Sequence, residues 1–331
     1  MSSNVFGIVL ALLGGVLVGN CMLPLKRIRT WPWECTWLVF SFVSLLLVPC
    51  LMAFLIVPEW PGLYTSLTFS ALLPSLLFGF GWGIAQVLFG ISVVRLGMAL
   101  AFTIVVGLGT VFGTLVPLVV LHKNELASSD SRALITGCAL MIFGVILSGY
   151  AGKLREQPQR ETSQGYLSGL AIAIVSGVLS SMLNLSLAFG GPIAQAAVHH
   201  GAQTSTAVFG VWPVALASGL IPNIGYATYL LYKNRSWKLF AHAPQDAFLS
   251  LLMGLLWIGA VLIYGLSTRY LGRLGDSAGW AIYQIVMVLT ANTAGIVTGE
   301  WKSASRRAYL ALASGVLILV LATVTTAVST R

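Results

Sequence analysis

Charged residues are scarce in this chain. Of its 331 residues, 57% are hydrophobic and only 8% carry a formal charge, whereas a soluble domain averages about 25% charged residues. Too little charge remains to cover a water-facing surface, so the composition excludes a soluble enzyme, a disordered chain and a nucleic-acid-binding domain. The sequence predicts instead an all-α polytopic membrane protein. Its uncharged runs are residues 1–25, 35–58, 60–94, 96–122, 133–152, 162–232, 247–268, 277–299 and 308–330, each about as long as, or longer than, the roughly 20 residues that cross a bilayer.

Cysteine and histidine are also rare, at four residues each. The cysteines lie in or beside apolar runs without disulfide or metal-ligand spacing, and no histidine pair has the spacing of a helical metal site. No phosphate-binding loop, Asp-rich motif or nucleophile–His–Asp set is present. We therefore expect no metal, no cofactor and no enzymatic activity, with a membrane-embedded enzyme as the alternative from another class. The first 25 residues lack a basic start, so no cleavable signal peptide is expected.

Splitting the two longest uncharged runs predicts ten transmembrane helices. Run 60–94 begins with polar, turn-rich residues, which places the start of its helix near Ser70. Run 162–232 is long enough for two helices. The connection between them, residues 189–203, is apolar enough to form either an interfacial or a re-entrant piece. The predicted helix centres are residues 14, 46, 78, 108, 142, 176, 217, 257, 288 and 318.

The distribution of Lys and Arg predicts the orientation. Thirteen of them lie in alternate loops that begin with residues 26–33, and five lie in the opposite set, which includes both termini. Because cytoplasmic loops carry the excess of Lys and Arg, we expect both termini outside a bacterial-type cytoplasmic membrane. The same pattern accounts for the net charge of +9 without nucleic acid. The cationic clusters are Lys26/Arg27/Arg29, Lys153/Arg155/Arg160, Lys233/Arg235/Lys238 and Lys302/Arg306/Arg307.

The two halves of the chain share an internal repeat at an offset of 175 residues. Five helices in each half would invert the second copy relative to the first, and inverted repeats are typical of secondary transporters that bind substrate near the membrane midplane. The repeat therefore predicts a carrier with two halves, residues 1–155 and 156–331. The matching pairs are Gly79/Gly254, Trp82/Trp257, Ala85/Ala260, Gly90/Gly265, Ser92/Ser267, Leu96/Leu271, Gly97/Gly272, Glu125/Glu300 and Arg132/Arg307.

Several sequence motifs are spread along nearly the whole chain. They are Pro24-x-Lys26-x-x-x-x-Trp31-x-Trp33-Glu34-x-x-Trp37, Leu73-Pro74-x-x-Leu77-Phe78-Gly79-x-x-Trp82-Gly83-Ile84, Leu96-Gly97-Met98, Gly113-Thr114-Leu115-x-Pro117, Asp276-x-x-x-Trp280 and Glu300-Trp301-x-x-Ala304-x-Arg306-Arg307. Together they resemble the L-rhamnose–proton symporter family of the drug/metabolite transporter superfamily.

This resemblance implies proton-coupled import of a monosaccharide or deoxysugar such as L-rhamnose. The partners it implies are a small-molecule sugar, protons and the lipid bilayer, and no obligate protein partner is evident. Gln86 stands where an asparagine is expected, and the residues after Trp280 also depart from the family pattern, so the identity of the sugar stays open. Export of amino acids or other metabolites by the same fold is the alternative function.

Acidic residues are the candidates for proton coupling, because an acid buried in a membrane is costly and changes its protonation readily. Asp276 is the first candidate, since the resemblance places the fourth and ninth helices at the central cavity. Glu34 is the second, and both acids could instead be helix caps. Glu300 is expected to form a cytoplasmic salt bridge or gate. The remaining acids are assigned to solvated loops: Glu59, Glu125, Asp130, Glu156, Glu161 and Asp246.

Sugar recognition needs flat aromatic faces for the C–H groups of the ring and amides for its hydroxyls. Trp280, Tyr283 and Gln284 share one helical face with Asp276, and Trp82 and Gln86 share another. Each aromatic could instead be a packing or interfacial residue, and each amide a link between helices. The other mid-span candidates are Asn184, Trp212, Asn223, Trp257, Tyr264 and Asn292.

Overall fold

The computed structural model describes residues 3–155, 163–299 and 301–329. Within these residues the chain forms ten helical spans long and apolar enough to cross a membrane. Each span contains one of the predicted centres, which confirms the prediction of an all-α polytopic membrane protein.

The helices within these spans and their connections have the following bounds. They are α1 Ser3–Asn20, α2 Trp33–Phe42, α3 Val48–Ile56, α4 Trp60–Thr65, α5 Phe69–Leu96, α6 Met98–Leu121, α7 Ser129–Arg155, α8 Ser163–Ser180, α9 Met182–Ala188, α10 Gly191–His199, α11 Trp212–Asn234, α12 Pro244–Tyr270, α13 Gly275–Val297 and α14 Arg306–Val328. The shorter turns are η1 Leu23–Arg27, η2 Val43–Leu47, η3 Lys123–Glu125, η4 Ala207–Gly210 and η5 Ser236–Ala241.

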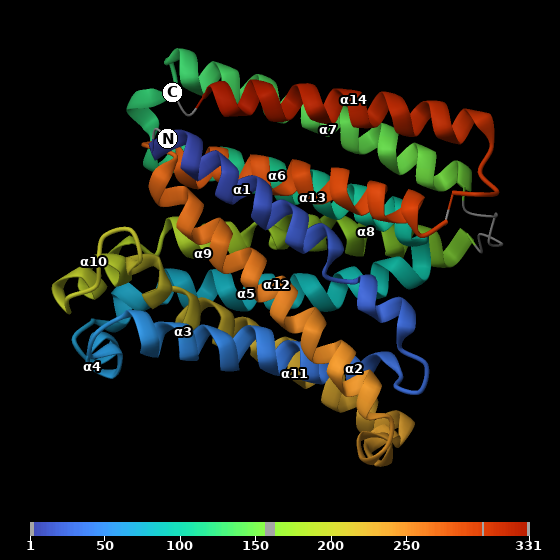
Figure 1. Cartoon of the computed structure of the whole chain (residues 1–331), viewed down its shortest axis with the longest axis horizontal. Helices are drawn as coiled ribbons and strands as arrows, with labels where there is room; N and C mark the ends of the chain where they lie inside the picture. The colour runs from blue at the N-terminus through green and yellow to red at the C-terminus, as the bar shows by residue number, and fades with distance from the viewer. Residues whose placement is uncertain (1–2, 156–162, 300, 330–331) are drawn as a thin grey trace.

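The long helices run roughly along one axis of an elongated bundle (Figure 1). Helix α1 packs against α12 and α13, and α8 packs against α5 and α6. Helix α5 also packs against α11, and α12 against α2, while α7 and α14 lie side by side along one edge (Figure 1). The N- and C-termini lie at the same end of the bundle (Figure 1).

Glycine allows helices α5 and α11 to approach closely. A Cβ atom at Gly79 would overlap the carbonyl oxygen of Ala215, and one at Gly83 would overlap that of Gly219. Backbones this close are typical of helix pairs in membranes, where small residues replace the missing hydrophobic driving force. This contact fixes the part of α5 that carries Trp82.

Residues 189–203 form mainly a short helix, α10. It packs against α4 and η4, at the same end of the bundle as the termini (Figure 1). Helix α4 covers the turn-rich start of run 60–94, and the spanning helix α5 then begins at Phe69, next to the predicted start at Ser70.

Asp246 corrects one expectation, because it is not a solvated loop acid. It lies in the first turn of α12 with 3% of its surface exposed. Its carboxylate accepts backbone N–H bonds from Arg29 at 3.4 Å, Thr30 at 2.7 Å and Trp31 at 3.0 Å. Three donors replace the water that the carboxylate loses on burial. Asp246 therefore joins the α1–α2 connection to the start of α12.

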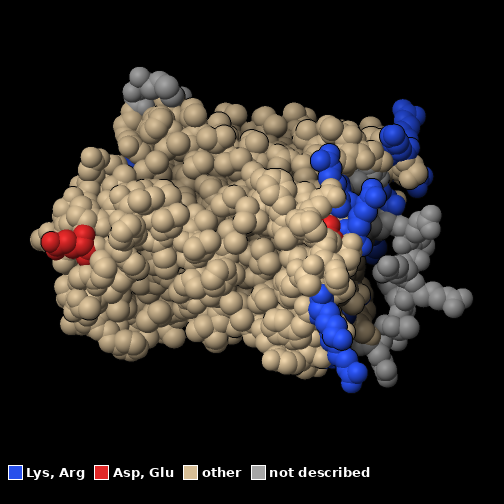
Figure 2. Space-filling view, turned by 60° about the horizontal axis from the view of Figure 1, so that its bottom comes forward, with Lys and Arg blue, Asp and Glu red and all other residues tan. Residues whose placement is uncertain are grey.

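Lys and Arg side chains gather at the end of the bundle opposite the termini (Figure 2). The face between the two ends carries few charges (Figure 2), as expected where a chain meets hydrocarbon. The cationic clusters predicted from the sequence that fall on described residues belong to the connections at this end, which we call the basic end. We call the other the terminal end.

Candidate functional site

A cavity of about 450 Å³ lies between helices α1, α5, α6, α7, α12 and α13. Its lining runs from Trp82, Trp257 and Trp280 to Lys26, Arg155 and Trp301, which lie at the basic end. Its volume falls within the usual range of about 300–1,000 Å³ for small-molecule sites. On α13 the lining begins at Trp280, so among the described residues the cavity opens toward the basic end and stops short of the terminal end.

One wall of the cavity is formed by two stacked indole rings. Trp82 of α5 and Trp257 of α12 lie with their centroids 5.3 Å apart and their planes inclined by 22°. Both side chains are largely buried in the protein, and both line the cavity. These are the two tryptophans that the internal repeat pairs with each other.

A second aromatic pair comes from α13. Trp280 and Tyr283 stack with centroids 5.8 Å apart, and Tyr264 of α12 packs behind both rings. The Trp280 Nε1–H donates to the carbonyl oxygen of Gly109 at 3.1 Å. A Cβ atom at Gly113 would overlap the same indole nitrogen. Helix α6 therefore holds the Trp280 ring in place and closes the deep end of the cavity.

Three amide side chains line the cavity: Gln86, Gln284 and Asn292. The glutamines form no hydrogen bond with any residue that the structure describes. The Asn292 Nδ2 atom is buried and, within the described ranges, has no acceptor. An amide presents both a donor and an acceptor, so these groups can pair with vicinal hydroxyls of a polar ligand.

Two predicted amides lie outside the cavity lining and hold helices together. Asn184 donates to the carbonyl oxygens of Gly113 at 2.7 Å and Asp276 at 3.0 Å, and it accepts the hydroxyl of Tyr264. Asn223 accepts the Trp37 Nε1–H at 2.9 Å and donates to the carbonyl oxygens of Gly83 and Gly219. Their hydrogen-bonding groups already have protein partners.

Trp212 is also away from the cavity. Its side chain is fully buried, and its ring packs against α12 at Gly265. The structure therefore brings together Trp82, Trp257, Trp280, Tyr283, Gln86, Gln284 and Asn292, and it places Asn184, Asn223, Trp212 and Tyr264 in the surrounding packing.

The two candidate acids lie at opposite ends of the bundle. Glu34 is at the basic end, where it accepts hydrogen bonds from Asn234 Nδ2 at 2.9 Å and Ser236 Oγ at 2.7 Å. Asp276 lies in the first turn of α13, one helical turn beyond Trp280 toward the terminal end. Neither side chain lines the cavity. Glu300, Glu156 and Glu161 lie outside the described residues.

His122 is a neighbour of Asp276 that the sequence did not single out. It follows the last residue of α6, and its Nε2 lies 3.0 Å from Asp276 Oδ1. The hydrogen bond to Asp276 raises the pKa of the imidazole above its ordinary value. Arg273, considered from the sequence as a partner of Asp276, instead pairs with Glu125 at 2.6 Å. The juxtaposition of the fourth and ninth helices implied by the resemblance is the signal that could have found His122.

Comparison with known proteins identifies the family. The family described as L-rhamnose-proton symport protein (RhaT) matches residues 1–330. A protein of Citrobacter koseri named L-rhamnose-proton symporter is 27% identical over 327 residues, which cover 96% of this chain and 95% of the relative. Proteins of the same name from Yersinia pestis and Yersinia pseudotuberculosis are each 26% identical over 329 residues, covering 96% of both chains.

The ten apolar spans, the cavity between them and the match over nearly the whole length agree with one another. The chain is a multi-pass membrane protein that belongs to the L-rhamnose-proton symport protein family.

Proposed function

We propose that this chain imports a monosaccharide or deoxysugar, such as L-rhamnose, together with protons across a bacterial cytoplasmic membrane. The observation that carries the proposal is the cavity in which two aromatic pairs face three amides without protein partners among the described residues. The names of the relatives support the same substrate class. They also favour a carrier over an enzyme, and nothing in them favours the alternative, an exporter of amino acids or other metabolites.

The aromatic rings are proposed to hold the apolar face of the sugar. Sugar C–H groups pack on flat rings, and Trp82, Trp257 and Trp280 present such surfaces in the cavity. Gln86 follows Trp82 by one helical turn, and Gln284 follows Trp280 by the same spacing, so each ring has an amide beside it. Amides next to rings can bind the hydroxyls at the edge of the sugar.

An inverted repeat of residues 1–155 and 156–331 is part of the proposal. Advancing each span by five turns the contacts of α1 with α12 and α13 into those of α8 with α5 and α6. The contact of α5 with α11 becomes that of α12 with α2, and the pair α7–α14 maps onto itself. Gly97 and Gly272, paired by the sequence offset, both have positive φ, 84° and 75°. Alternating access would then follow from rocking of the two halves.

The basic end is proposed to face the cytoplasm, with both termini outside. Lys and Arg concentrate at that end (Figure 2), and cytoplasmic loops carry the excess of these residues. In this orientation the cavity is open to the cytoplasm. Asp276 is proposed as the proton-coupling residue, because it lies on the helix that carries Trp280 and one turn away from it. Glu34 is the second candidate.

Uptake into proteoliposomes tests this function. With acid outside, the reconstituted chain is expected to accumulate radiolabelled L-rhamnose or a related sugar, and a protonophore is expected to abolish accumulation. The same vesicles loaded with amino acids test the exporter. If no sugar of a broad panel is transported or stabilises the protein against heat, the proposal fails.

A further inference from the structure

At the terminal end, α6 and α13 are joined by a pair of titratable side chains. His122 Nε2 lies 3.0 Å and 3.2 Å from the two carboxylate oxygens of Asp276. The side chains are 21% and 18% exposed, so solvent on this face reaches both. His122 stands at the carboxyl end of α6 and Asp276 in the first turn of α13. The two helix dipoles therefore favour a cationic imidazole facing an anionic carboxylate.

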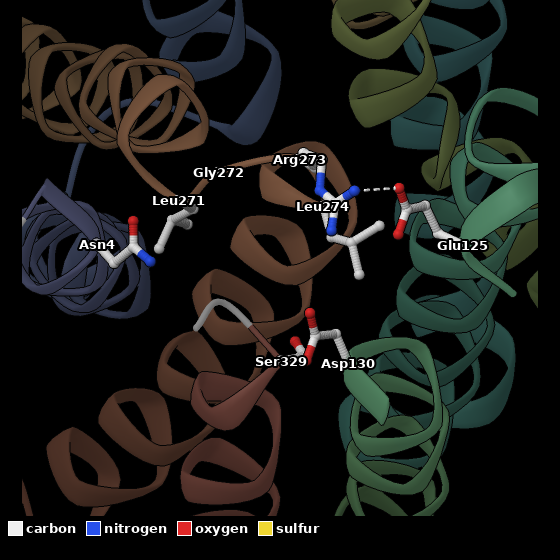
Figure 3. A pocket seen from close by; sticks show the side chains of 8 residues that line it. All are labelled: Asn4, Glu125, Asp130, Leu271, Gly272, Arg273, Leu274 and Ser329. Atoms are coloured by element: carbon white, nitrogen blue, oxygen red, sulfur yellow. Dashed lines mark hydrogen bonds and ion pairs between the residues drawn. The ribbon is translucent and has the colours of Figure 1, made fainter. Parts of the chain in front are cut away.

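A second ion pair links the same helices through their connections. Arg273 Nη1 lies 2.6 Å from Glu125 Oε1, and Figure 3 shows the two side chains facing each other from the start of α13 and the end of α6. A cleft of about 160 Å³ beside them includes Asp130, Gly272 and Ser329. Two ties at one end oppose separation of α6 from α13 there.

Protein packing separates this end from the cavity. Trp280 lies between them, with its ring against Gly109 and Gly113. Asn184 adds a polar bridge, because it donates to carbonyl oxygens of both helices, at Gly113 and Asp276. Ser277, next to Asp276, is fully buried, and its hydroxyl has no partner among the described residues. A buried hydroxyl without a partner is costly, so opening this end to water would relieve that cost.

Several charged groups face the pair. From η3, Lys123 adjoins His122 and Glu125 acts on the imidazole electrostatically. Asp276 faces it from α13, and Arg269 and Tyr264 of α12 act on the Asp276 carboxylate. Arg273 is held by Glu125. The hydrogen bond to Asp276, followed by the charges of Asp276 and Glu125, raises the pKa of His122 above its ordinary value near 6.5.

We propose that His122 and Asp276 form a proton-dependent latch that closes the terminal end of the transport path when the imidazole is protonated. This inference rests on the proposed function, because a latch needs an alternating-access cycle to act on. Acid at the terminal face strengthens the latch and favours the state with the cavity open to the basic end. In the proposed orientation, external acid therefore promotes closure behind an imported sugar.

The sign follows from the direction of the pKa shift. A histidine whose pKa is raised by its partner contributes stability to the closed state that is fully present below about 6.5, and that contribution disappears as the pH rises through the raised pKa. Closure should weaken from neutral to alkaline pH. A glutamine in place of His122 donates one hydrogen bond but does not titrate, so its closure should not depend on pH in this range.

Thiol accessibility at position 277 tests the latch. The chain carrying Ser277→Cys is placed in lipid nanodiscs without sugar and pulsed with a maleimide at about pH 5.5 and about pH 8.5, on either side of the histidine range. Modification is read at position 277 by peptide mass spectrometry, because the chain also has four native cysteines. Since thiolate chemistry itself accelerates with pH, the quantity compared is the rate with His122→Gln added, divided by the rate without it.

We expect this ratio to be about two- to fivefold at the acid pH, the change that follows the loss of a partly exposed ion pair, and close to one at the alkaline pH. His199→Gln, an exposed histidine on α10, is the matched control and should give a ratio of one at both. A His122→Gln ratio of one at both pH values, or one equally raised at both, overturns the latch. The assay uses no sugar, so a working latch without sugar uptake would refute the proposed function alone, and uptake with a flat ratio would refute the latch alone.

Discussion

Trp82 and Trp257 come from corresponding places in the two halves of the chain and stack on each other with their ring centroids 5.3 Å apart. In a structure related by a two-fold axis, only residues near that axis can meet their own counterparts. The stacked rings therefore indicate where the proposed axis crosses the cavity, and this is also where an inverted-repeat carrier is expected to bind its substrate.

Replacing Trp82 by alanine should weaken sugar binding. The cavity would lose one aromatic face and Trp257 would lose its stacking partner, so the dissociation constant should rise about tenfold, equivalent to about 1.4 kcal/mol. Isothermal titration with the transported sugar measures the change. Trp237→Ala, which removes an indole 42% exposed and away from the cavity, is the control and should bind as the parent does. Equal affinities in both variants would remove Trp82 from the site.

The amides should separate into two classes. Gln284→Ala removes a cavity amide and should weaken sugar binding with little effect on thermal stability. Asn223→Ala removes three hydrogen bonds among α2, α5 and α11, so it should lower the melting temperature, by a loss of about 1–3 kcal/mol for each buried group left without a partner. Melting curves with and without sugar distinguish these results. A stable Asn223→Ala that fails to bind sugar would reverse the two assignments.

Asp276→Asn should lose proton-driven accumulation and keep exchange of sugar across the membrane. The neutral amide cannot change its charge with a proton, but the cavity beyond Trp280 stays intact. Counterflow and gradient-driven uptake in the same proteoliposomes measure the two activities. If accumulation is unchanged, Asp276 is not the coupling residue, and Glu34→Gln becomes the variant to examine.

Gly113→Ala should disturb the contact between α6 and α13. Its new Cβ would overlap the Trp280 indole nitrogen, and the ring must move because the opposing backbone is rigid. We expect a loss of about 1–3 kcal/mol, the usual cost of overpacking, seen as a lower melting temperature. Gly90→Ala is the matched control, since no atom lies within 4 Å of a Cβ at that position. Similar melting of the two variants would contradict the close contact.

Asp246→Asn should destabilise the basic end. The amide cannot accept all three backbone N–H groups that the carboxylate accepts, so a buried donor loses its partner at a cost of about 1–3 kcal/mol. Thermal unfolding measures this cost. Glu59→Gln, at a side chain 82% exposed, should have no effect, and a melting temperature shared by both variants would show that Asp246 holds nothing in place.

The sequence alone predicted the spans because hydrocarbon imposes a simple rule on charge along the chain. It did not predict the role of Asp246, since the backbone donors of residues 29–31 meet that carboxylate from more than 200 residues away. His122 was missed for the same reason: beside a loop its titration looks ordinary until Asp276 is placed next to it. Asn184 and Gln284 are both mid-span amides, and only the packing shows which has partners.

The equivalence of the two halves also has a chemical limit. In the proposed repeat, Gln86 of α5 corresponds to Val261 of α12, which is fully buried. One half thus offers an amide to the cavity where the other offers no polar group. A sugar has no two-fold symmetry, and this difference gives it a single preferred way to lie against the paired indoles. Duplication could build a symmetric scaffold, but stereospecific recognition depends on the positions where the two copies have since diverged.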